Sequence, residues 1–110
     1  MARGSKLSIT INARDIPLLA EAASLSQQGF VTGASHRNWD SYGADVVLAD
    51  GISATLRDLL TDAQTSGGLL VSCAAEAAEA LLGRIREAGY PAAAIVGTVA
   101  EGPTRIEVNT

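Results

Sequence analysis

Alternating and helically spaced apolar residues divide the first third of the chain into two elements. Residues Leu7–Ile11 alternate strictly between apolar and polar side chains, which predicts a half-buried strand. Asp15 is a suitable N-cap, and Pro17 is well tolerated in a first helical turn. Leucines and alanines then recur at helical spacing until Gly29, a residue typical of a left-handed helix end. The pattern predicts a helix over residues 16–28.

The second half of the chain predicts two helices and several short strands. Ser53 is placed to cap a helix that carries Leu56, Leu59 and Leu60. A later helix has apolar residues at i, i+3, i+4 and i+7 and ends at Gly89; these residues are Ala78, Leu81, Leu82 and Ile85. Short apolar or alternating runs predict strands at Val46–Leu48, Leu69–Cys73, Ala93–Val99 and Arg105–Val108.

The segment from Phe30 to Asp50 is rich in glycine and small polar residues, and apart from the short strand near its end we expect a loop there. It contains the only His and the only Trp of the chain, His36 and Trp39, together with Tyr42. A long loop in a compact domain is often functional or lies at an interface. The two aromatic rings therefore either form a docking patch or close a small satellite core.

The order of these elements predicts an α+β fold, with helices packed on a mixed β-sheet. A turn at Glu101–Pro103 joins the last two strands, which we expect to form a hairpin. A length of 110 residues fits one domain over residues 1–110.

Composition and charge exclude several kinds of partner. The net charge is −4 and Lys6 is the only lysine, so the basic footprint of a nucleic-acid-binding protein is missing. No apolar run is long enough to span a bilayer. The single cysteine, Cys73, is compatible with a reducing cytosol, and we expect a cytoplasmic protein.

The residues alone do not supply a self-contained catalytic set. His36 has no partner at metal-ligand spacing, which is typical of a solvated loop residue. Cys73 ends an apolar run with no base nearby, which favours an inert core thiol over a nucleophile. Asp62 either caps the turn that follows it or faces a ligand. We therefore predict no catalytic and no metal-ligating residue in this chain.

The stretch from Asp62 to Gly68 carries the most specific local signal. Its glycine pair, Gly67-Gly68, permits backbone angles that are closed to other residues and a close approach to a neighbour. Free N–H groups in such a turn can form an anion-binding concavity, although a tight turn that leads into a core strand has the same pattern. No Lys-Ser or Lys-Thr follows the glycines, so this is not a P-loop.

The run Asp-Ala-Gln-Thr-Ser-Gly-Gly-Leu-Leu at Asp62–Leu70, here named the signature segment, resembles the Asp-Pro-Gln-Thr-Ser-Gly-Gly-Leu-Leu signature of selenophosphate synthetases. Ala63 departs from the proline of that family. The similarity extends from about Arg3 to Val108 and includes Ile16-Pro17, Arg37-Asn38 and Ala94–Gly97. The resemblance implies a truncated C-terminal lobe of the aminoimidazole ribonucleotide synthetase type, with a partly ferredoxin-like topology.

The family makes selenophosphate, AMP and phosphate from selenide, ATP and water, with magnesium. Its catalytic cysteine or selenocysteine, its lysine and its metal-binding aspartates lie in segments that precede this one. The resemblance therefore implies that this chain walls the nucleotide cleft and is inactive alone, and that magnesium and ATP are cofactor and substrate of the full-length enzyme. Its partner would be the missing N-terminal ATP-binding lobe, with a homodimer as a further possibility. The residues implied to contact nucleotide or phosphate are Asn38, Gln64, Thr65, Ser66, Gly67 and Gly68. The alternative is a free-standing ligand-binding or regulatory module that has kept the fold without catalysis.

Overall fold

The structure is a computed structural model that describes all of residues 1–110. Its α-helices are α1 (Ala2–Ser5), α2 (Ala22–Gln27), α3 (Gly33–Tyr42), α4 (Ala54–Leu60) and α5 (Ala78–Glu87). Its strands are β1 (Ser8–Asn12), β2 (Val46–Leu48), β3 (Gly97–Ala100) and β4 (Ile106–Asn109). Three single turns of 3₁₀-helix complete the list: η1 (Ala13–Asp15), η2 (Gly43–Asp45) and η3 (Ala75–Ala77).

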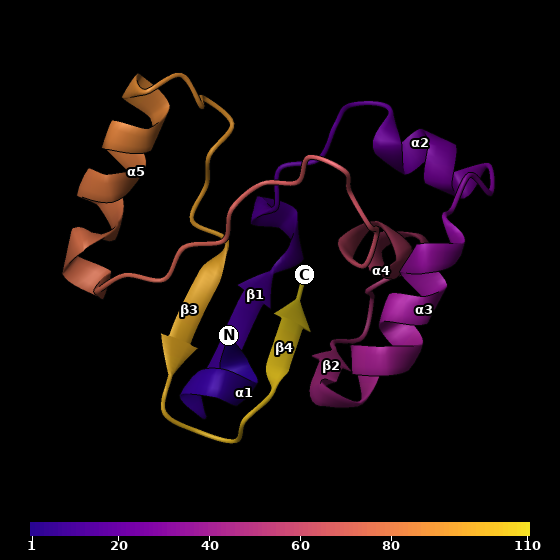
Figure 1. The fold of residues 1–110 in the computed structure, drawn as a ribbon, viewed down its shortest axis with the longest axis horizontal. Helices are drawn as coiled ribbons and strands as arrows, with labels where there is room; N and C mark the ends of the chain where they lie inside the picture. The colour runs from indigo at the N-terminus through magenta and orange to yellow at the C-terminus, as the bar shows by residue number, and fades with distance from the viewer.

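The four strands form one mixed sheet in the order β2-β4-β1-β3 (Figure 1). Strand β4 is parallel to both β1 and β2, with Ile9 and Val46 each opposite Ile106, whereas β3 is antiparallel to β1. The predicted hairpin between the last two strands is wrong, because β1 lies between β3 and β4. The turn residues alone predicted the hairpin, but both strands pair with β1 instead, each through four residues.

Helices α2, α3 and α4 pack together on the β2 side of the sheet, and α5 lies beyond β3 on the other side (Figure 1). This arrangement of helices around a mixed sheet confirms the predicted α+β class. Only six of the 110 residues are buried, and the apolar ones lie around the centre of β1 and β4; they are Ala2, Ile9, Ala13 and Val108. The core is therefore thin for a chain of this length.

The predicted helix over residues 16–28 is too long, since only Ala22–Gln27 is helical. Asp15 does not cap it, because its carboxylate accepts a hydrogen bond from Asn12 Nδ2 (2.7 Å) within η1. The end is as predicted, with Gly29 in the left-handed region at φ 91°.

The predicted loop before β2 is also wrong, because it contains the ten-residue helix α3. Thr32 starts this helix by accepting a hydrogen bond from the Ser35 backbone N–H at 3.1 Å. Strand β2 and the Ser53-capped helix α4 lie where the sequence predicts them, with Ser53 Oγ accepting from Leu56 N at 3.1 Å.

The largest error concerns the run Leu69–Cys73, which is not a strand in this structure. Leu69 is 94% exposed, and Leu70 and Val71 are each 57% exposed. None of the backbone N–H groups of residues 63–74 donates a hydrogen bond within the protein. A strand forms only where a neighbour supplies its ladder, and no strand lies against this run. As a result the outer edge of β3 stays open, and all four β3 residues are exposed.

Candidate functional site

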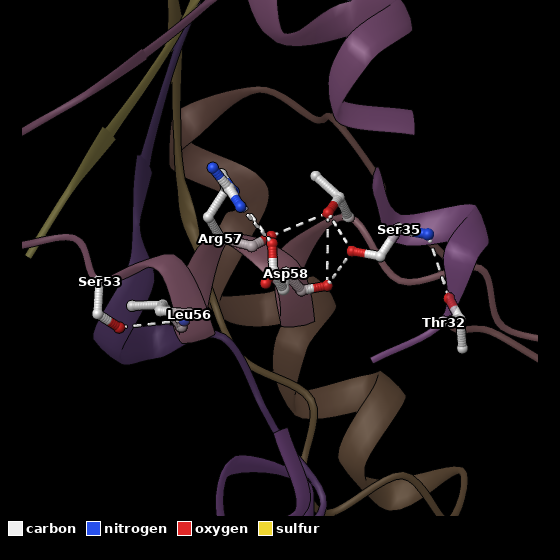
Figure 2. A network of polar contacts seen from close by, with 7 residues as sticks. Thr32, Ser35, Ser53, Leu56, Arg57 and Asp58 are labelled. Atoms are coloured by element: carbon white, nitrogen blue, oxygen red, sulfur yellow. Dashed lines mark hydrogen bonds and ion pairs between the residues drawn. The ribbon is translucent and has the colours of Figure 1, made fainter. Parts of the chain in front are cut away.

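A polar network joins α3 to α4 immediately before the signature segment (Figure 2). At its centre is Ser35, whose side chain is fully buried. Ser35 Oγ donates to the backbone carbonyl of Asp58 at 2.7 Å and lies 2.7 Å from Thr61 Oγ1. Thr61 in turn reaches the carbonyl of Arg57 at 3.0 Å. These bonds fix the last turn of α4 against the first turn of α3.

Two further bonds connect α3 to the start of the signature segment. The hydroxyl of Thr32, while accepting from the backbone of Ser35, donates to Asp62 Oδ1 at 2.8 Å. Asn38 Nδ2 donates to the backbone carbonyl of Thr61 at 2.8 Å. Asp62 therefore does not cap its own turn with this oxygen, and the start of the signature segment is held by α3.

The structure places the predicted site residues in two groups. Asn38 lies at the base of the signature segment, half-buried, with its amide engaged by Thr61. The other five residues, Gln64 to Gly68, are all exposed and make no side-chain hydrogen bond. Asn38 thus supports the segment from below, and Gln64–Gly68 project from the surface. Their contact with a nucleotide stays a prediction.

The fold of this chain does not require glycine at positions 67 and 68. Neither has a positive φ, so the backbone freedom predicted for the pair is not used. A Cβ at Gly68 would meet nothing within 4 Å, and one at Gly67 would make only ordinary contact with Gln64, at 3.5 Å. A close approach by something outside this chain remains a physical reason for two glycines here.

Of the two aromatic residues, Trp39 is half-buried against Arg57 of α4 and Gly43. The Arg57 guanidinium lies 5.4 Å from the centroid of the Trp39 ring, and it pairs with Asp58 at 2.7 Å. Gly43 packs so tightly on this ring that a Cβ there would be 2.9 Å from its atoms. Tyr42 is 60% exposed and lies under Arg3, with 5.8 Å between the guanidinium carbon and the ring centroid.

The most important residues that the sequence analysis missed are Thr32, Ser35 and Thr61. The only local signal was a threonine that precedes a short run of small residues, a pattern suited to an N-cap. Nothing in the sequence shows that Ser35 on one helix meets Thr61 at the end of another.

The structure brings no catalytic constellation together. No group of three His, Cys, Asp or Glu side chains lies close enough to hold a metal ion. Cys73 is exposed, so the predicted core thiol is wrong, because the run that it ends is itself unpacked. No helix has both the length and the apolar character needed to cross a membrane.

Comparison with known proteins matches residues 1–109 to the family model "AIR synthase related protein, C-terminal domain". The selenide, water dikinase of Rhizobium meliloti (strain 1021) is 58% identical over 98% of this chain and 31% of its own length. The enzyme of that name from Dechloromonas aromatica (strain RCB) is 45% identical over 98% of this chain and 31% of its own length. These similarities confirm the resemblance predicted from the signature segment, and the chain spans about 31% of these relatives.

Proposed function

The chain belongs to the AIR synthase related protein family, as its C-terminal domain, and on that premise we propose that it is the C-terminal domain of a selenophosphate synthetase. The whole enzyme would convert selenide, ATP and water to selenophosphate, AMP and phosphate. This domain would wall the nucleotide cleft and pack against the ATP-binding lobe, which lies outside the chain. Alone it would be inactive.

Magnesium, which the family implies, does not fit the carboxylates of this chain. Asp58 is paired with Arg57, Asp62 accepts from Thr32, and no three potential ligands converge. The magnesium ligands would therefore come from the preceding lobe. The contribution of this domain is positional: a rigid support under an exposed glycine-containing loop, which suits a reaction that depends on positioning and electrostatics.

The single observation that carries the proposal is the state of the glycine pair. In this domain Gly67 and Gly68 are exposed, open and free of positive φ, although they lie in the segment that most resembles the family. Their small size is explained if a phosphate group or the preceding lobe approaches the backbone of Gln64–Gly68 closely.

A glycine replacement in a full-length enzyme carrying this domain tests the proposal. Gly68→Val should lower turnover at least tenfold and leave the melting temperature within about 2 °C, because a Cβ at Gly68 meets nothing within 4 Å. Gly83→Val is the matched control, since a Cβ at Gly83 in α5 also meets nothing within 4 Å. If Gly68→Val lowered turnover and stability together, the pair would be a structural turn and the proposal would fail.

The apolar run Leu69–Val71 and the outer edge of β3 are both exposed in this chain. We infer that the preceding lobe covers them in the whole enzyme. Without that lobe, we expect the isolated chain to dimerise weakly through this surface, because bare apolar patches find partners. Sedimentation should show an average mass that rises with concentration, and Leu69→Asp should abolish the rise. Leu19→Asp, at a leucine that is 82% exposed elsewhere, should not. A wild-type monomer at every concentration would contradict this expectation.

The alternative, a free-standing binding module, makes a different prediction for the isolated chain. Titration with magnesium-ATP should then give saturable amide NMR shifts confined to residues 62–68 and 37–42. If the domain only completes the cleft of a larger enzyme, millimolar ligand should leave these amides unshifted.

A further inference from the structure

The peptide unit between Thr61 and Asp62 is bonded on both sides where the chain leaves α4. Thr61 is the C-cap of that helix, and helix ends leave their last carbonyls without an intrahelical partner. The Thr61 carbonyl accepts from Asn38 Nδ2 on α3 at 2.8 Å. The Asp62 N–H donates to the carbonyl of Leu59 on α4 at 3.3 Å. The orientation of this peptide unit is therefore set jointly by α3 and α4.

The side chain of Asp62 makes a third bond at the same point. Its Oδ1 accepts from the hydroxyl of Thr32 at 2.8 Å, and the same hydroxyl is fixed because it accepts from the Ser35 backbone N–H. Asn38, which makes the bond to Thr61, is half-buried. The backbone and the side chain at the start of the signature segment are therefore both held from α3.

Beyond Asp62 the chain has no further anchor until η3. No backbone group of residues 63–73 makes a hydrogen bond within the protein, and the next such contact is made by the carbonyl of Ala74, the N-cap of η3. The direction in which Gln64–Gly68 leave the domain therefore depends on the anchor at Asp62. Ser66 follows Asp62 by four residues, a reach of at most about 14 Å, so a tilt of about 10° at the anchor would move it by up to about 2 Å.

We propose that Asn38 and Thr32 are positioning residues for the reaction of the whole enzyme. They act through Thr61 and Asp62 on the exposed segment Gln64–Gly68, which would contact phosphate under the proposed function on which this inference rests. Asn38 thereby has a different role from the direct contact that the family resemblance implies, because its amide nitrogen already donates to Thr61. A misplacement of about 1 Å can lower a rate about 100-fold, so a small loss of anchoring has a large kinetic effect.

Steady-state kinetics of a full-length enzyme carrying this domain test the inference. Asn38→Leu keeps the approximate size of the side chain and removes its amide. It should lower kcat at least tenfold and change KM for ATP by less than about threefold, because a displaced segment loses contacts made in the transition state. Asn109→Leu, the same change at an exposed residue that ends β4, should leave both constants unchanged. A rise in KM for ATP with unchanged kcat would overturn the inference.

A double-mutant cycle with Gly68→Val separates positioning from a general loss of stability. Because Asn38 acts through the segment that contains Gly68, Asn38→Leu should lower kcat by less than about twofold in the Gly68→Val enzyme. Effects that multiply would overturn the inference and leave the proposed function standing. If Gly68→Val alone left turnover unchanged, the proposed function would fail, and this inference with it.

Thr32 supplies a second pair of variants in case Asn38→Leu does not fold. Thr32→Ser keeps the hydroxyl that donates to Asp62 and should retain kcat within about twofold, whereas Thr32→Val removes it and should lower kcat at least tenfold. Both are assayed well below their melting temperatures, since Thr32→Val also loses the cap of α3. Equal kcat values for the two variants would refute the positioning role of Thr32.

Discussion

Replacement of Ser35 by alanine tests the network that holds α3 against α4. Three short contacts meet there: Ser35 to the Asp58 carbonyl, Ser35 to Thr61, and Thr61 to the Arg57 carbonyl. The two hydroxyls have only two hydrogens, so two of the three contacts can be hydrogen bonds at any moment. Without Ser35 Oγ, Thr61 keeps its bond to Arg57, and the Asp58 carbonyl retains only a 3.4 Å contact with Thr61. The variant therefore loses one net hydrogen bond in a fully buried place.

The expected cost follows from that count. One lost bond with a partly unsatisfied carbonyl costs about 1–2 kcal/mol, after the small gain in helix propensity from serine to alanine. Urea unfolding of the isolated chain, monitored by circular dichroism, should show the lower midpoint at unchanged slope. Ser41→Ala, exposed on the same helix, should change stability by less than about 0.5 kcal/mol.

A double-mutant cycle with Thr61→Val separates this network from a general effect of packing. Because two hydroxyl hydrogens serve the three contacts, the effects of the two substitutions should not be additive. We expect a coupling energy of about 0.5–1 kcal/mol. If Ser35→Ala were no more destabilising than Ser41→Ala, the hydrogen-bond count would be wrong and α3 would not be fixed by this network.

Three other variants probe the places where side-chain size or a cap decides the fold. Gly97→Ala should destabilise by at least about 2 kcal/mol in urea unfolding, since its Cβ would overlap the Thr10 carbonyl in the neighbouring strand; Gly4→Ala, with nothing within 4 Å, should not. Thr32→Val should cost about 1–2 kcal/mol by removing both the cap of α3 and the bond to Asp62, whereas Thr104→Val, outside this network, should have little effect. Gly43→Ala should move the Trp39 ring and shift its fluorescence maximum; an unchanged spectrum would show that this packing is loose.

The sequence predicted the elements that rest on local chemistry. Strand β1 follows from strict alternation, α4 from the Ser53 cap, and α5 from apolar spacing with Gly89 at its end, where φ is 103°. The signature segment predicted the family through nine residues that differ from the family signature only at Ala63, an agreement that is rare by chance.

Helix α3 was missed because its stabilising contacts are tertiary. Its own residues are poor helix formers, including glycine, serine, asparagine and aspartate. It is held by Thr32 at its start and by the bonds of Ser35 and Asn38 to the end of α4. The bonds of Ser35 and Asn38 join residues more than twenty positions apart and leave no periodic trace in the chain.

The sequence by itself determined the family, the α+β class and the helices and strands whose signals lie within a few residues of one another. Only the tertiary structure decided that β1 separates β3 from β4, that α3 supports the signature segment, and that Leu69–Val71 stays unpaired. The physical reason is that local patterns fix which face of an element is apolar, whereas its neighbour depends on contacts that close over long stretches of chain.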